Sequence, residues 1–395
     1  MARDPGNGQL SKPVLLAEDT ITMEELRALS DWMLAGHRLT KAEETVTFER
    51  QFADWIDSDH AIFVNSGSSA NLLMIAALQQ AGRLRNNRAI AAAVSWVTTV
   101  APLLQLGFDT RLCDCDSENL GLDLDHLEDL CRTHQPSVLI LVHVLGHANH
   151  LSEIMDICQR YGVILLEDSC EALGSEYSGK KLGTHATAGS FSFYYGHHIS
   201  TIEGGMVVTD DHDLHQMMLS LRSHGWSRDL SPERRAELTD QYEIDAFRNL
   251  YTFYNAGFNL RSTDLQARIG QSQMKKIDKI TEVRARNFET YRKALSEYFV
   301  QTSDTDPLSS FAYGTFVENR LETYERLKAE DIECRPLICG NIARHPFWLK
   351  DHEAESLPNA DKVHDSGMYL PNHQNLTPDD VERVASVFKS VARPA

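Results

Sequence analysis

Short apolar runs alternate with helical patterns between about residues 60 and 210. Five runs are typical of strands: AIFVNSG, AIAAAVSW, SVLILVHVLG, VILLEDSC and GGMVVTD. Two of the segments between them repeat apolar residues at helical spacing: SSANLLMIAALQQAG and LSEIMDICQRYG. This alternation predicts an α/β fold in which helices cover both faces of a mainly parallel sheet. Ligands of such folds bind at the carboxyl ends of the strands.

The pattern changes beyond this region. Residues 221–256 are polar, and we expect them to form an excursion from the core. A long helical pattern then begins at Leu265, LQARIGQSQMKKIDKITEVRARNFETYRKALSEYF, with apolar residues spaced three and four apart. A chain of 395 residues is long enough for more than one substructure. We expect an N-terminal tail over residues 1–20, a large domain over 21–275, and a linking helix with a smaller α+β C-terminal domain over 276–395.

Composition and charge exclude several classes of protein. Hydrophobic residues make up 42% and charged residues 24%, as in ordinary globular proteins. The chain has 38 lysines and arginines and 57 aspartates and glutamates, and the resulting net charge of −19 repels nucleic acid and anionic membranes. Because no secretory signal pattern and no apolar run of about 18 residues occurs, we expect a cytoplasmic protein without nucleic-acid or membrane partners.

The cysteines do not indicate a disulfide framework or a metal site. There are seven, an odd number without the spacing of a secreted framework, so we expect reduced thiols. Cys113 and Cys115 lie in RLCDCD, which alternates like the end of a strand, and no second pair lies nearby. We therefore expect no bound metal.

Three groups of chemically capable residues follow predicted strands. The first, NSGSSAN at 65–71, opens a helix whose small residues and N–H groups suit a phosphate, although a serine-rich helix cap is the alternative. In the second, Asp168 ends the run LLED, where a carboxylate is suited to hold a heteroaromatic nitrogen protonated; a surface carboxylate is the alternative. The third and most specific is GSFSFYYGHHISTIEGG at 189–205.

From about Leu39 to its C-terminus the chain resembles the DegT-type sugar aminotransferases, a family of fold-type I pyridoxal phosphate (PLP) enzymes. The matching motifs are SGSSAN, the aromatic residue in AVSW, LEDSCEALGS, SFSFYYGHH followed by EGG, RSHGW, GFNLRSTDLQARIG and ECRP. In that family a lysine that holds the cofactor covalently lies five residues beyond the serine of SF(S)F. Counting from Ser192, that position is His197.

The missing lysine changes the expected chemistry. No lysine occurs between Lys181 and Lys275, so the whole window that should hold the cofactor-linking amine lacks one. Imidazole has no primary amine, so we expect the cofactor to bind non-covalently, with pyridoxamine phosphate (PMP) as its resting form. Histidine still transfers protons, because its unperturbed pKa of about 6.5, against about 10.4 for lysine, makes the neutral base available near pH 7.

Within the family, the lysine-to-histidine change resembles the 3-dehydratases of nucleotide-linked 4-keto-6-deoxy sugars. One kind acts on GDP-4-keto-6-deoxymannose on the way to colitose, and the other acts on CDP-linked sugars with a [2Fe–2S] cluster. A cluster needs four thiolates near the site, and no cysteine occurs from residue 171 to 333, so the resemblance favours the cluster-free kind. The resemblance also leaves open a conventional sugar aminotransferase and a non-catalytic regulator of the same fold.

The same resemblance implies roles for individual residues. The expected phosphate contacts are Gly67, Ser68, Ser69 and Ser192. Trp96 is expected to stack on the cofactor ring, with a core tryptophan as the alternative, and Asp168 to pair with the ring nitrogen. Glu171 is expected near the ring hydroxyl, with a helix N-terminal carboxylate as the alternative. Asn259 implies a homodimer with shared active sites, since its counterpart in the family reaches the partner's phosphate.

The proton-transfer and substrate residues follow from the same motifs. His197 is favoured as the base, and His198 competes with it because the loop before EGG varies in length within the family. His224, Arg228 and Arg335 are candidate contacts to a nucleotide-sugar substrate, although surface arginines are usually only solvated. L-glutamate is the expected co-substrate that regenerates PMP, and an O-antigen or similar lipopolysaccharide is the expected destination of the deoxysugar.

Overall fold

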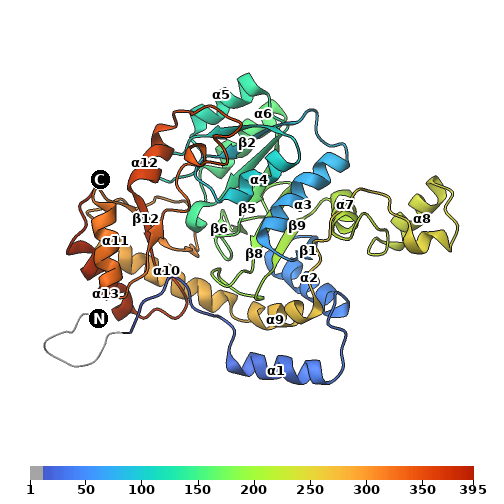
Figure 1. The fold of residues 1–395 in the computed structure, drawn as a ribbon, viewed down its shortest axis with the longest axis horizontal. Coiled ribbons are helices and arrows are strands. Elements are labelled where there is room, and N and C mark those ends of the chain that lie inside the picture. The colour runs from blue at the N-terminus through green and yellow to red at the C-terminus, as the bar shows by residue number, and fades with distance from the viewer. Residues whose placement is uncertain (1–11) are drawn as a thin grey trace.

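A seven-stranded sheet forms the centre of the molecule in the computed structural model, which describes residues 12–395 (Figure 1). Its strands lie in the order β1-β9-β8-β5-β4-β2-β3. Their bounds are β1 His60–Val64, β2 Arg88–Ala92, β3 Asp109–Cys113, β4 Val138–Val142, β5 Ile164–Asp168, β8 Ala188–Ser192 and β9 Gly205–Thr209. Each of the five apolar runs expected to form strands does so.

The pairing confirms a mainly parallel sheet. Strands β8, β5, β4, β2 and β3 pair in parallel, whereas β9 runs antiparallel to both of its neighbours, β1 and β8. The parallel strands direct their carboxyl ends to one edge of the sheet, where Asp168 and Ser192 end β5 and β8. The α/β fold class expected from the sequence is confirmed.

Helices cover both faces of the sheet, because alternate residues of a strand point to opposite sides. Ile62 and Val64 of β1 belong to the main core, which includes α3 (Gly67–Gln80) and α7 (His212–Arg222). Ala61 and Phe63 belong to a separate cluster with α2 (Glu43–Ile56) and α9 (Asp264–Met274). The other helices beside the sheet are α4 Val97–Gln105, α5 Leu124–His134 and α6 Leu151–Tyr161, whereas α1 Met23–Leu34 packs on α9.

The long helical pattern that begins at Leu265 forms two helices and not one. Helix α9 ends at Met274, and α10 runs from Ile277 to Ala294. Between them the amide of Lys276 donates to the carbonyl of Gln273 at 2.9 Å, which is a turn rather than a continued helix. Figure 1 shows α10 extending from α9 toward the C-terminal elements.

The C-terminal elements surround a second, three-stranded sheet, β10-β12-β11. Their bounds are β10 Tyr313–Phe316, α11 Arg320–Ala329, β11 Arg335–Pro336, α12 Pro358–Ser366, β12 Gly367–Leu370 and α13 Pro378–Lys389. Side chains from α10, α11, α13 and this sheet form a separate hydrophobic cluster. This second cluster supports a domain boundary near residue 275, which stays a prediction.

Two other expectations are corrected in part. Within the expected tail, residues 1–11 lie outside the described structure, but Val14 is buried and exchanges backbone hydrogen bonds with Asp331 and Glu333, both at 2.9 Å. Within the expected polar excursion, α8 (Pro232–Gln241) and the 3-10 turn Arg248–Tyr251 project from the body (Figure 1), whereas Arg222 is buried. Arg222 is drawn inward because Glu49 and Asp229 balance its charge.

Small elements complete the described fold. They are the β6–β7 hairpin, Glu176–Tyr177 with Lys180–Lys181, and the 3-10 turns Val144–Gly146 and Ile342–Arg344. All seven cysteines are free, and Cys113 is the last residue of β3, as the alternating pattern predicts. No helix within residues 12–395 is both long and apolar enough to cross a bilayer.

Candidate active site

A cavity of about 410 Å³ lies at the carboxyl ends of β5 and β8. Its walls come from the start of α3, the start of α4, the segment after β8 and the C-terminal sheet. It is lined by Ser66, Gly67, Ser68, Asn71, Trp96, Thr98, Thr99, Val142, Asp168, Cys170, Glu171, Ser192, Tyr194, Gly196, His197, Glu203, Phe311, Arg335, Ile338 and Tyr369. Three groups of residues that are separate in the sequence therefore meet where α/β folds bind ligands.

The first turn of α3 forms one end of the cavity. Ser66 caps the helix, and its hydroxyl accepts from the amide of Ser69 at 3.1 Å. Gly67 follows, and a Cβ atom at Gly67 would lie 2.6 Å from the Cβ of Ser192, so only glycine allows α3 to approach β8 this closely. Ser68 lines the cavity, whereas the hydroxyl of Ser69 donates to Asn65 at 2.6 Å. The free amides of a helix start, with the Ser192 hydroxyl opposite, suit a phosphate.

Asp168 is held at the cavity wall by three donors. Its carboxylate accepts from Asn71 Nδ2 at 2.8 Å, from Thr99 Oγ1 at 2.7 Å and from the amide of Cys170 at 3.2 Å. The preceding residue, Glu167, points to the opposite side of β5, where its carboxylate contacts His143 Nε2 at 2.8 Å and accepts from backbone amides. Strand alternation thus separates a cavity carboxylate from a structural one.

Glu171 adds a second carboxyl group to the cavity. Its Oε2 accepts from the amide of Leu145 at 2.9 Å. Removal from bulk water, with a smaller contribution from the charge of Asp168, raises the pKa of Glu171 to about 8. The structure does not support a helix N-terminal carboxylate here, since Glu171 lies in turns between β5 and β6. A carboxyl with this pKa donates a hydrogen bond near pH 7.

His197 faces the cavity between two aromatic rings. Its ring centroid lies 5.4 Å from that of Phe311 and 6.2 Å from that of Tyr194. Burial, followed by the charge of Arg284, lowers the pKa of His197 to about 4, so the imidazole is neutral at physiological pH. Its Nδ1 has no hydrogen-bond partner among the side chains and backbone of residues 12–395. Such a ring is available to accept a proton from a bound molecule.

His198 occupies a different environment. Its side chain is buried, and its Nε2 lies 2.9 Å from the carbonyl oxygen of Ser309. It is absent from the cavity wall, which differs from the expected substrate contact, because consecutive side chains leave this loop in different directions. Of the two neighbouring histidines, His197 is the one that reaches the cavity.

Trp96 lines the cavity at the N-cap of α4 and is 56% exposed, which excludes a core tryptophan. A broad aromatic surface beside the carboxylate of Asp168 suits a flat heteroaromatic ring.

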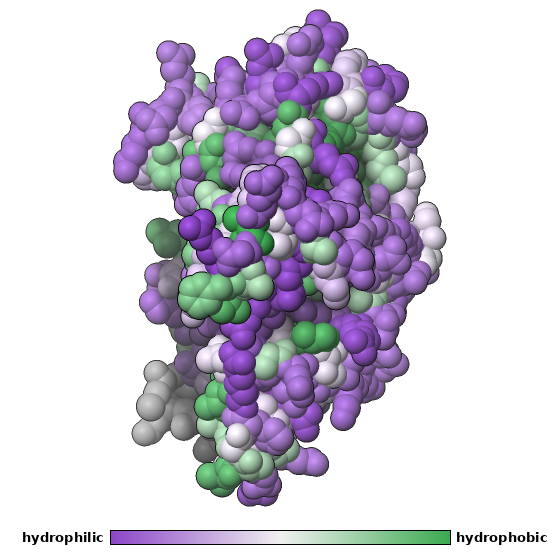
Figure 2. All heavy atoms as spheres, turned by 90° about the vertical axis from the view of Figure 1, so that its right-hand side faces the viewer, coloured by the Kyte–Doolittle hydropathy of each residue, from purple (hydrophilic) through white to green (hydrophobic). Residues whose placement is uncertain are grey.

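Three expected residues lie away from this cavity in the single chain. Arg261 contacts both Asn259 Oδ1 and His224 Nε2, each at 3.1 Å. Arg228 lies over the ring of Trp226 and lines a separate cavity of about 480 Å³. These residues belong to the side of the molecule that carries α8. Hydrophilic residues cover most of that side, with hydrophobic side chains scattered among them (Figure 2). Their expected roles stay predictions, since the chain alone does not bring them to Asp168.

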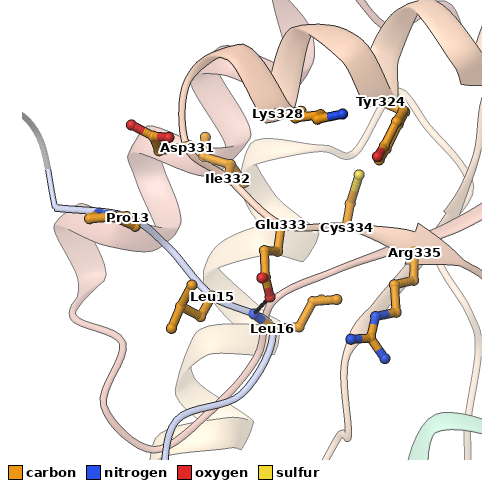
Figure 3. A pocket seen from close by; sticks show the side chains of 10 residues that line it. All are labelled: Pro13, Leu15, Leu16, Tyr324, Lys328, Asp331, Ile332, Glu333, Cys334 and Arg335. Carbon is orange, nitrogen blue, oxygen red and sulfur yellow. Dashed lines mark hydrogen bonds between the residues drawn. The ribbon is translucent and has the colours of Figure 1, made fainter. Parts of the chain in front are cut away.

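Arg335 lies at the edge of β11 between two cavities. It lines the main cavity and also one of about 370 Å³, where Glu333 accepts from the amide of Leu16 at 2.9 Å (Figure 3). Aliphatic side chains and the polypeptide from Pro13 to Leu16 form much of that second wall. Its lining includes none of the residues expected to contact the cofactor.

Sequence reasoning missed the residues that support the site. Asn71 and Thr99 hold Asp168, and Asn71 was visible in SGSSAN one helical turn beyond Gly67. Phe311 and Tyr369 come from the C-terminal part and carried no local signal. Long-range packing alone brings them to the cavity, and Phe311 to the ring of His197.

Comparisons with known proteins agree with this geometry. The model of the DegT/DnrJ/EryC1/StrS aminotransferase family matches residues 19–389. A GDP-4-keto-6-deoxy-D-mannose 3-dehydratase of Yersinia pseudotuberculosis is 33% identical over 387 residues, covering 95% of this chain and 98% of the relative.

Two solved structures are similar over nearly the whole chain. One is a GDP-4-keto-6-deoxymannose-3-dehydratase with a trapped PLP-glutamate geminal diamine, with a TM-score of 0.86 and 30% identity, covering 95% of this chain and 100% of that one. The other is a histidine-to-asparagine mutant of such an enzyme with bound GDP-perosamine, with a TM-score of 0.88, 31% identity and the same coverage. This chain therefore belongs to the DegT/DnrJ/EryC1/StrS aminotransferase family.

Proposed function

We propose that this protein is a PMP/PLP-dependent 3-dehydratase that removes the C3 hydroxyl of a nucleotide-linked 4-keto-6-deoxy sugar, GDP-4-keto-6-deoxy-D-mannose. One observation carries the proposal: the cavity has the residues for the cofactor but no lysine. Among the described residues that line it, the basic side chains are His197 and Arg335. The relatives named above as dehydratases support the choice of reaction and of substrate.

The residues present fit pyridoxamine phosphate. The start of α3 with Ser192 suits the phosphate, and the absence of a Cβ at Gly67 keeps these two walls together. Asp168, fixed by Asn71 and Thr99, is placed to hold the ring nitrogen protonated. Trp96 presents its exposed ring for stacking, and Glu171 supplies a hydrogen bond to the ring hydroxyl. Non-covalent binding follows from the absence of a cavity lysine.

When bound, the cofactor supplies a primary amine for the C4 ketone and a conjugated ring that accepts electrons. The chain supplies the proton transfers. The neutral ring of His197 accepts a proton and returns it to the C3 hydroxyl as that group leaves as water. Tyr194 and Phe311 flank the ring, and the burial that lowers its pKa makes the protonated imidazole a strong acid, which favours return of the proton.

The product is the 4-keto-3,6-dideoxy sugar, with ammonia released from the amine. L-glutamate restores PMP and leaves as 2-oxoglutarate, a role supported by the PLP-glutamate adduct in the similar structure. A lysine in place of His197 would capture the cofactor covalently and favour transfer of the amine to the sugar. The dideoxy sugar belongs to colitose-type biosynthesis for lipopolysaccharide O-antigens, carried out in the cytoplasm.

The enzyme acts as a homodimer with shared active sites. Large hydrophobic side chains are exposed on the projecting segment around α8, including Phe247 at 82% and Tyr251 at 75%. A second copy packed on this segment would remove these side chains from water, which favours association. Closure of the dimer is expected to carry Asn259, His224 and Arg228 toward the partner's cofactor and substrate.

The test is an incubation of purified protein with PMP, L-glutamate and GDP-4-keto-6-deoxy-D-mannose, in which ammonia and the mass of the sugar are measured. We expect loss of the C3 oxygen with release of ammonia. His197→Asn should abolish both while retaining PMP binding, which controls for folding. His197→Lys should abolish dehydration and trap the cofactor covalently.

Different results would identify a different protein. An intact C3 oxygen with a new amine at C4 would make the protein a sugar aminotransferase. Visible absorption of an iron-sulfur cluster in the purified protein would indicate the CDP-sugar kind of dehydratase. Tight PMP binding without turnover of GDP-, CDP- or dTDP-linked 4-keto sugars would indicate a regulator.

A further inference from the structure

Three histidines lie close together at the edge of the sheet opposite the cavity, where β1 begins. His60 is the first residue of β1, and His212 and His215 lie on the first turn of α7. One ring nitrogen of each lies within 4.8 Å of those of the other two. Among residues 12–395 no other set of three histidine, cysteine or acidic side chains comes this close in a geometry suited to one ion.

One nitrogen-to-nitrogen distance in the group matches metal coordination. His60 Nε2 and His212 Nδ1 lie 3.4 Å apart. Two nitrogens that bind one tetrahedral zinc ion at 2.0–2.1 Å lie about 3.3 Å apart. A hydrogen bond between two neutral rings also explains that one contact, but it leaves the third ring unexplained. His215 stacks on His60 with centroids 4.1 Å apart, and its buried Nδ1 has no hydrogen-bond partner within residues 12–395.

The rings of His60 and His215 are nearly parallel, with 3° between their planes. A ring nitrogen binds a metal ion in the plane of its ring, so two stacked parallel rings do not point at one ion. Coordination by both therefore requires the two rings to turn out of their stack toward a shared point.

The surrounding charges favour a cation. A cavity next to His60 is lined by one lysine and four carboxylates, those of Asp54, Asp57, Asp59 and Asp210. Arg222, whose charge acts on His215, is balanced by Glu49 at 2.5 Å and Asp229 at 3.4 Å. The local field therefore attracts a divalent ion rather than repelling it.

The group is separate from the cofactor cavity. His60 pairs with Thr209 at one end of β1, whereas Val64 pairs with Gly205 at the other, beside Ser66 and Gly67. Four residues of strand separate the two ends by about 13 Å. An ion at the histidines would join β1 to α7 without contacting the substrate.

We propose that His60, His212 and His215 bind one divalent transition-metal ion of the zinc class, which ties the start of β1 to the first turn of α7. Imidazole ligands suit Zn²⁺, Co²⁺, Ni²⁺ and Cu²⁺ and discriminate against Mg²⁺ and Ca²⁺, which take oxygen ligands. The fourth position is left for water, as expected for a site with three protein ligands. An ion that binds the folded chain and not the unfolded one raises the melting temperature.

The test uses the full chain, without a histidine tag and after treatment with a chelator. Zn²⁺ is titrated by calorimetry and Co²⁺ by its visible absorption. We expect one ion per chain, a higher Tm with Zn²⁺, and no effect of Mg²⁺. His212→Gln is the main variant because His212 is exposed and its replacement leaves the core intact. It should weaken Zn²⁺ binding at least about tenfold and remove the shift in Tm.

His134→Gln is the matched control, since His134, at the end of α5, lies beside Asp109 and belongs to no histidine group. It should bind Zn²⁺ like the wild type. His215→Gln provides a second loss of a ligand, with circular dichroism to verify folding. Absence of saturable Zn²⁺ binding in the wild type would overturn the proposal. Equal affinity in the wild type and in a folded His212→Gln variant would also overturn it, because the ion would then lie elsewhere.

Discussion

Replacing Gly67 with alanine tests whether the contact between α3 and β8 shapes the phosphate end of the cavity. The added Cβ would lie 2.6 Å from Ser192 Cβ, 3.1 Å from Ser192 Oγ and 3.1 Å from Cys170 Sγ. Ser192 Cβ is bonded directly to the backbone of β8, and Ser192 pairs with Gly205 of β9. Rotation of a side chain therefore cannot relieve the clash, and the start of α3 must move away from Ser192.

The size of the effect follows from two opposing terms. Overpacking of a tight contact costs about 1–3 kcal/mol. Alanine favours a helix over glycine by about 1 kcal/mol, which offsets part of this loss in the stability of the fold. That gain does not restore the phosphate site, since it acts equally with and without cofactor. The clash differs between the two states: the free chain relieves it by moving α3, whereas PMP binding requires α3 in its original place. At about 1.4 kcal/mol per factor of ten, PMP binding should therefore weaken about 5- to 150-fold.

The assay is a titration of apoprotein with PMP, followed by fluorescence, with thermal unfolding measured alongside. Gly196→Ala is the matched control: Gly196 also lines the cavity, but an added Cβ would meet nothing closer than Tyr194 at 3.8 Å. We expect the control to bind PMP nearly as tightly as the wild type. Wild-type affinity in Gly67→Ala would refute the inference that this close approach builds the site.

Three further predictions address single groups. Thr99→Val removes a 2.7 Å hydrogen bond to the Asp168 carboxylate. It should raise the activation free energy for kcat/KM by about 1.5–3 kcal/mol, so steady-state assays should show kcat/KM lowered roughly 10- to 150-fold. Because the pKa of His197 is lowered to about 4, this base stays neutral from pH 5 to 8, and kcat should not fall as the pH is lowered to about 5. A fall in kcat above about pH 5 that also occurs in folded variants at other positions would contradict the role of His197. Burial lowers the pKa of His147 to about 3, whereas the pKa in the unfolded chain is about 6.5. Between these two values the unfolded chain binds one more proton than the folded chain. Each pH unit of acidification from about pH 6.5 to about pH 3 should therefore lower the free energy of unfolding by about 1.4 kcal/mol. Urea titrations of His147→Leu should show a pH dependence of the free energy of unfolding that is smaller by this amount, because other buried histidines still contribute.

Local pattern was enough for five strands of the large sheet and for the order of the chemistry along the chain. The apolar runs that contain Val64, Val142 and Asp168 are buried strands, and short-range periodicity reports burial directly. The same patterns failed where a turn has no strong signal. The break at Lys275 and Lys276 contains neither glycine nor proline, so the helical spacing of α9 runs into that of α10 without a visible stop.

The absence of a lysine between Lys181 and Lys275 is also a property of the sequence alone, and it distinguishes this chain from family members that hold the cofactor through a lysine. What the sequence left open was which neighbour acts. Glu167 and Asp168 are adjacent acids, and His197 and His198 are adjacent imidazoles. Composition and spacing therefore do not show which member of each pair reaches the cavity. The tertiary structure separates them: Asp168 and His197 face the cavity, while Glu167 contacts His143 and His198 contacts Ser309.

Only the folded chain could decide these questions, because side-chain direction and desolvation depend on residues far away in the sequence. Phe311 lies against His197, and Arg284 lowers its pKa, although both lie beyond α7, α8 and α9 in the chain. The same is true of the three histidines, which β1 and α7 bring together from positions 60, 212 and 215. Local hydrophobic periodicity thus determines the elements and the candidate chemistry, whereas long-range packing determines which groups meet, lose water and act together.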